Sequence, residues 1–65
     1  TTREKILSYL SSEALKNNSN SFTIPFNRQE LADFLSVERS AMSAELSRMQ
    51  KDKLITYHKN NFTLL

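Results

Sequence analysis

The sequence predicts an α+β fold that is mainly helical, with three helices, a short edge strand and a C-terminal β-hairpin. Two observations lead to this prediction. Apolar residues recur every three or four positions in three stretches up to residue 51, which is the spacing of amphipathic helices. After residue 53 they fall into two short runs with a period of two, which is typical of paired strands. Since 65 residues can enclose only one small core, residues 1–65 are expected to form a single domain.

Composition limits the functions that this domain can perform. It contains no cysteine, no glycine and one histidine, which excludes a disulfide, a thiolate metal site and a glycine-rich phosphate loop. We therefore expect no metal, no cofactor and no enzyme activity in this domain. No apolar run is long enough to cross a bilayer and no secretion leader is present, so we expect a cytoplasmic protein without a membrane partner.

The first helix is predicted to begin at a capping box formed by Thr1 and Glu4. Ile6 and Leu10 follow at helical spacing, and the helix should end near Asn18 because asparagine tolerates the left-handed conformation. A short strand is predicted at residues 22–26, where bulky apolar residues alternate. Pro25 cannot donate a ladder hydrogen bond, so this strand should lie at a sheet edge.

Two further helices are predicted close together. Asn27 and Glu30 form a second capping box, so the second helix should begin at Arg28 and end at residues 35–37. The third helix is expected at residues 38–51. Its apolar stripe is predicted to face inward and consists of Met42, Leu46 and Met49. Two short helices separated by about three residues have helix-turn-helix spacing.

A β-hairpin is predicted at the end of the chain. Residues 54–58 and 61–65 read as its strands, and residues 59–60 or 60–61 can supply the positive dihedral angles of a tight turn. The order of capped helix, short turn, polar helix and basic hairpin is that of a winged helix-turn-helix, a fold that binds double-stranded DNA with its last helix in the major groove.

Polar residues on the outer face of the third helix are the candidate base-reading groups. Arg39 can bind guanine O6 and N7 with both arms of its guanidinium group, although an ordinary surface arginine would look the same. Ser40, Ser43 and Ala44 share that face, and small side chains allow close approach. The net charge of +2 is only mildly basic, but cations exceed acids from Arg39 onward.

Candidate phosphate-binding residues lie on either side of the third helix. Arg28 and Gln29 begin the second helix, where free amides and a cation can bind a phosphate. His58 and Lys59 are expected at the hairpin tip, and Ser47 lies further along the third helix. Each of these residues could instead be ordinary solvated surface.

Residues 26–35 (FNRQELADFL) and 38–49 (ERSAMSAELSRM), followed by Leu54 and Ile55, resemble the C-terminal DNA-binding domain of the Crp/Fnr family of bacterial transcription regulators. The resemblance implies binding to a pseudo-palindromic DNA site as a homodimer of a longer protein. It also implies an absent N-terminal domain that senses an effector such as a cyclic nucleotide, and RNA polymerase as a further partner.

The same resemblance assigns positions in the interface. It implies base-facing positions for Arg39, Ser40, Ser43 and Ala44. It implies DNA-backbone positions for Arg28, Gln29, Glu38, Ser47 and His58.

Three residues depart from the family pattern. Many relatives have arginine where this chain has Ala44, which leaves at most apolar contact with a thymine methyl group. Lys53 stands where the family usually has glycine, so a positive φ there would be costly. Glu38 is expected to cap the third helix poorly. The alternative function is a winged-helix module that binds a protein, but this would favour a protruding apolar anchor on the third helix, and none is evident.

Overall fold

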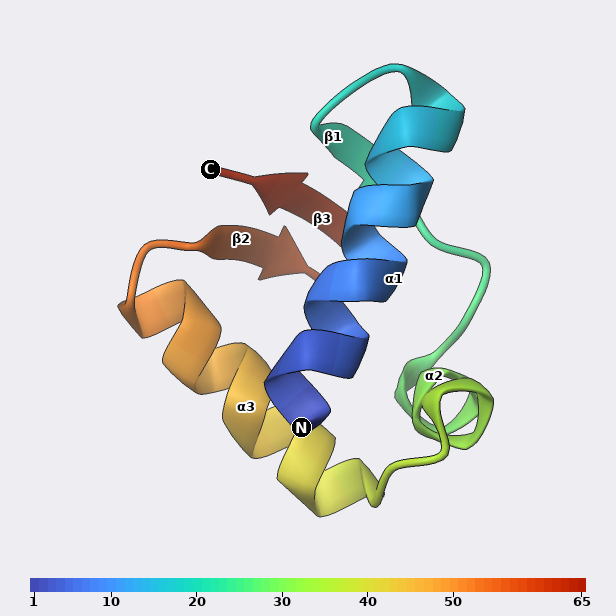
Figure 1. Cartoon of the computed structure of the whole chain (residues 1–65), viewed down its shortest axis with the longest axis vertical. Helices are drawn as coiled ribbons and strands as arrows, with labels where there is room; N and C mark the ends of the chain where they lie inside the picture. The colour runs from blue at the N-terminus through green and yellow to red at the C-terminus, as the bar shows by residue number, and fades with distance from the viewer.

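The computed structural model describes all residues 1–65 and contains three helices and one antiparallel sheet (Figure 1). In chain order, the elements are α1 (Thr2–Asn17), β1 (Ser21–Thr23), α2 (Arg28–Leu35), α3 (Arg39–Lys51), β2 (Ile55–His58) and β3 (Asn61–Leu64). The predicted fold class is therefore confirmed: the chain is mainly helical, with a helix-turn-helix at α2 and α3 and a C-terminal hairpin. None of the three helices is both long and apolar enough to span a membrane.

Both predicted capping boxes are present. At the start of α1, the Thr1 hydroxyl accepts a hydrogen bond from the Glu4 amide, and the Glu4 carboxylate accepts one from the Thr1 amine. At the start of α2, Asn27 Oδ1 accepts from the Glu30 amide and Glu30 Oε1 accepts from the Asn27 amide, both at 2.8 Å. These local bonds satisfy amides that have no partner inside the helix, so they fix where each helix begins.

The expectation that Glu38 would cap α3 poorly is wrong. The Glu38 carboxylate accepts a hydrogen bond from the Ser40 amide at 2.9 Å, while the Glu38 backbone is extended. The longer side chain of glutamate folds back far enough to reach this amide. The carboxylate also adds favourable negative charge at the positive end of the helix.

The sheet has the strand order β1-β3-β2, so β1 lies at an edge as predicted. It pairs only over residues 21–23, which is shorter than the predicted strand at residues 22–26. The Ile24 amide still donates to the Asn60 carbonyl at 2.9 Å, and Pro25, which has no amide hydrogen, follows at once. In the hairpin, Lys59 has φ 55°, so the tight turn is at residues 59–60.

The core lies between the helices and the sheet: α1 and α3 contact its strands, and α2 packs on α3 (Figure 1). All of its buried residues are hydrophobic: Ile6, Leu10, Phe22, Ile24, Leu31, Ala32, Met42, Leu46, Met49, Ile55 and Phe62. The predicted inward stripe of α3 is thus confirmed. An aromatic cluster of half-buried Tyr9 and Phe26 with exposed Phe34 joins α2 to α1, since the Phe26 ring lies 5.0 Å from Phe34 and 6.0 Å from Tyr9.

Candidate nucleic-acid interface

The outward face of α3 is exposed at the surface of the domain. The residues predicted to face bases, together with Ser47, are all exposed: Arg39, Ser40, Ser43, Ala44 and Ser47. The opposite stripe, which contains Met42, is fully buried. A helix of 13 residues spans roughly 20 Å, and one helix fits the width of the DNA major groove. The packing therefore leaves this polar face of α3 available to a ligand.

No large apolar side chain lies on that face. The exposed large hydrophobic residues of the domain are all outside α3: Leu15, Phe34, Leu54 and Leu65. Since protein interfaces are usually centred on large apolar or aromatic anchors, the outer face of α3 lacks the feature that a protein-docking helix needs.

Ion pairs form on the side of α3 that faces α1. Arg3 on α1 donates from Nε to Glu45 Oε2 at 2.5 Å and from Nη2 to Asp52 Oδ2 at 3.1 Å. Arg48 donates from Nη2 to Glu45 Oε1 at 2.7 Å. Figure 1 shows the N-terminal end of α1 beside the middle of α3, where these contacts form. The two bonds from Arg3 attach α3 and its C-cap residue Asp52 to α1, whereas the Arg48–Glu45 pair lies within α3 and holds the Glu45 carboxylate. None of these residues belongs to the predicted base-facing set.

Arg28, at the start of α2, lies against the hairpin. Its guanidinium carbon is 5.1 Å from the centroid of the Phe62 ring and 5.5 Å from that of Tyr57. Arg28 Nη2 donates to the Lys59 carbonyl at 2.5 Å, and Arg28 Nη1 is buried without a hydrogen-bond partner. The side chain that was predicted to bind a phosphate is therefore half-buried and engaged within the protein.

The pKa of Arg28 reports what surrounds it. Burial is the main cause that lowers this pKa below its ordinary value; nearby Tyr57 opposes the shift, and repulsion from Arg39 adds to it. The hydrogen bond from Arg28 to the Lys59 carbonyl brings the start of α2 and the hairpin tip together, so the side chains of Arg28 and Lys59 add positive charge on this side of the molecule.

The other residues that were predicted to contact the DNA backbone divide into two kinds. Gln29, Ser47, His58 and Lys59 have exposed side chains. The Gln29 amide nitrogen donates to Asp33 Oδ1 at 3.0 Å, which orients the side chain without burying it. Glu38 is exposed as well, but its carboxylate is bound to the Ser40 amide and carries the same sign of charge as a phosphate.

Sequence reasoning missed the residues that position this surface. Tyr57 and Phe62 are cross-strand partners with stacked rings 5.6 Å apart, and together they form the platform beneath Arg28. Their place next to the predicted turn was a usable signal, because opposed aromatic residues in a hairpin stack and present a ring face. No such signal pointed to Arg3, which lies 42 positions before Glu45.

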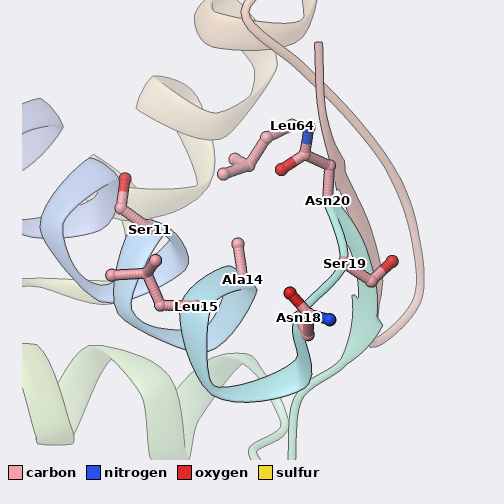
Figure 2. Close-up of a pocket in the computed structure, with 7 residues that line it drawn as sticks. All are labelled: Ser11, Ala14, Leu15, Asn18, Ser19, Asn20 and Leu64. Atoms are coloured by element: carbon pink, nitrogen blue, oxygen red, sulfur yellow. The ribbon is translucent and has the colours of Figure 1, made fainter.

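A second surface feature lies elsewhere. Figure 2 shows an open hollow lined by the last turns of α1, residues 18–20 and Leu64. Its lining residues are uncharged, and none belongs to α2 or α3. No group of three or more histidine, cysteine, aspartate or glutamate side chains is arranged to hold a metal ion. This hollow therefore lacks the charged side chains that are present on the surface formed by α2, α3 and the hairpin.

Comparison with known proteins is consistent with this geometry. The family model described as Crp-like helix-turn-helix domain matches residues 4–65, which is nearly the whole chain. No curated protein and no solved structure matches.

Proposed function

We propose, from the premise that this chain belongs to the Crp-like helix-turn-helix domain family, that α3 reads a specific double-stranded DNA sequence in the major groove. The coarser function follows from membership itself: the domain binds DNA as part of a transcription regulator. The family is one of DNA-binding domains, not of enzymes.

One observation supports the finer proposal more than any other. The face of α3 that includes Arg39, Ser40 and Ser43 is exposed along the helix, whereas the opposite stripe is buried in the core. A recognition helix needs this division, because base edges in the major groove are reached only by side chains that project from the protein. Arg39 is proposed to bind guanine O6 and N7, and Ala44 to contact a thymine methyl group.

Phosphate contacts on either side of α3 complete the proposed interface. Gln29 and the amides at the start of α2 contact one stretch of backbone, while His58 and Lys59 at the hairpin tip contact another. Ser47 lies one turn beyond Ser43 and hydrogen-bonds a phosphate. Glu38 acts through its cap on α3, because its carboxylate would repel a phosphate that approached it directly.

The biological setting in this proposal rests on the family alone. The domain serves as the DNA-binding output of a longer bacterial regulator that binds a pseudo-palindromic site as a homodimer. A separate N-terminal domain senses a small effector such as a cyclic nucleotide, and RNA polymerase is a further partner.

Selection of bound duplexes from a random pool tests sequence-specific binding. The chain should enrich a short motif over the input pool. Ser43→Glu places a carboxylate on the outer face of α3 and should abolish enrichment. Ser8→Glu makes the same change at an exposed position of α1 and should leave the motif intact. An output pool with no enriched motif, or equal enrichment by both variants, would refute the proposal.

A further inference from the structure

The contact between Arg28 and the hairpin joins the two sides of the proposed interface. Arg28 is the first residue of α2, and Lys59 is the first residue of the hairpin turn, 31 positions later. The guanidinium group covers the stacked Tyr57 and Phe62 rings and donates to the Lys59 carbonyl. This places the tip of the hairpin beside the start of the helix-turn-helix.

The turn itself needs such a contact. Lys59 has φ 55°, which is the left-handed region, where a residue with a Cβ atom is disfavoured relative to glycine. A charge-assisted hydrogen bond to its carbonyl favours the conformation in which that oxygen points toward Arg28. The bond therefore selects one orientation of the turn, and with it the directions of the His58 and Lys59 side chains.

The orientation of the guanidinium group is poorly suited to a phosphate. Nη1 is buried and Nη2 already donates one hydrogen bond to the Lys59 carbonyl, so the two Nη groups are not open together for end-on bidentate binding of a phosphate. The planar group instead lies over two aromatic faces, an arrangement that arginine adopts readily and that holds it against the hairpin.

We propose that Arg28 is a positioning residue for the wing: it affects DNA binding through His58 and Lys59, which it holds in reach of the backbone beside α3. This inference rests on the proposed function, since it assigns a role within the DNA interface. It replaces a direct phosphate contact by Arg28 with a contact inside the protein that fixes the positions of the His58 and Lys59 side chains.

A double-mutant cycle separates positioning from direct contact. The probe is a short fluorescent duplex of mixed sequence at low salt, because phosphate contacts do not require a particular site. Arg28→Met should weaken binding by about threefold to tenfold in the parent chain. In a chain that also carries His58→Ala and Lys59→Ala, the same change should weaken binding by less than about twofold, because the groups that Arg28 positions are gone.

Gln29→Ala is the matched control for the cycle. Gln29 is the next residue on α2 and is proposed to contact the backbone directly, so its effect should be the same in both backgrounds. If Arg28→Met weakens binding equally in both backgrounds, as Gln29→Ala does, then Arg28 binds phosphate directly and the inference is wrong. If the parent chain does not bind the duplex at all, the proposed function fails instead.

A second pair of variants leaves Arg28 in place. Tyr57→Leu removes one ring of the platform, whereas Tyr57→Phe keeps it and removes only the hydroxyl. If Arg28 acts by positioning the hairpin, Tyr57→Leu should bind DNA more weakly than the parent chain, and Tyr57→Phe should bind it as tightly as the parent. A direct phosphate contact predicts parental binding for both variants. Folding of each variant is checked by the nuclear Overhauser contacts between α1 and α3.

The parent chain itself gives a third measurement. Nuclear Overhauser contacts between the Arg28 side chain and the Tyr57 and Phe62 rings should persist when the duplex is added. Their loss on DNA binding, with new contacts from Arg28 to the duplex, would overturn the inference even if no variant folds.

Discussion

The guanidinium group of Arg3 on α1 and the carboxylate of Glu45 on α3 are joined by a hydrogen bond of 2.5 Å between Nε and Oε2. The Glu45 side chain is only 12% exposed, so the bond lies largely between the two helices. It fixes α3 to the rest of the domain through the side that faces away from the proposed DNA. The helix α3 is thus oriented without using any residue of its outer face.

This relationship predicts an acid dependence of stability. Hydrogen bonds from Arg48 and then from Arg3 hold the pKa of Glu45 below its ordinary value of 4.5. The folded state therefore binds fewer protons than the unfolded chain in acid, so the contribution of Glu45 is complete above the unfolded pKa and disappears as pH falls through the folded one. Glu45→Gln should lower the free energy of unfolding at neutral pH. The difference in this free energy between the variant and the parent should become smaller in acid.

Urea unfolding across the acid range measures this difference. Asp33→Asn is the control, since Asp33 is an exposed carboxylate that forms no ion pair, and its curve should follow that of the parent. A constant gap between the parent and Glu45→Gln at every pH would contradict the role of the Glu45 charge.

The turn between α3 and β2 predicts a stabilising substitution. Lys53 has φ 62°, which lies in the left-handed region that favours glycine. Lys53→Gly should raise the free energy of unfolding by about 1 kcal/mol, because the Cβ atom is strained in this region. Lys51→Gly, at the last residue of α3, should lower it by about 0.5–1 kcal/mol. Thermal unfolding of both variants and of the parent measures these changes in stability. A loss of stability in Lys53→Gly would show that the turn is not strained at Lys53.

Salt dependence tests the wing contact. The logarithm of the DNA association constant should fall linearly with the logarithm of salt concentration, with a slope of about −0.9 for each phosphate neutralised. Lys59→Ala should make this slope shallower by about 0.9. Lys16→Ala removes an exposed lysine near the end of α1 and should not change the slope. Equal slopes for the parent and Lys59→Ala would exclude a phosphate contact by this residue.

Much of the fold could be predicted because its boundaries depend on local bonds. Thr1 with Glu4 and Asn27 with Glu30 bind each other three residues apart, so sequence spacing alone locates the two helix starts. The end of β1 was less predictable, since it depends on pairing with β3 from the far end of the chain. Glu38 was misjudged because intrinsic cap preference does not describe how one longer side chain reaches the Ser40 amide.

The candidate interface was predictable in part for the same reason. The exposed positions of α3 follow from its apolar stripe, so helical periodicity alone separates Ser43 from Met42. The engagement of Arg28 could not be predicted, because it depends on where the hairpin tip lies relative to α2 in space. Arg28 and Lys59 are distant in sequence, and only the folded core brings them together.

Binding of Arg39→Ala to the selected duplex is the most direct test of the proposal that α3 reads bases. Its affinity should be weaker by about 1–3 kcal/mol, which is roughly fivefold to 150-fold, and its base preference should relax at one position of the motif. Its affinity for a mixed-sequence duplex should fall much less. If Arg39→Ala binds the selected duplex as tightly as the parent, with the same preference at every position, then Arg39 does not read a base and the proposed interface is wrong.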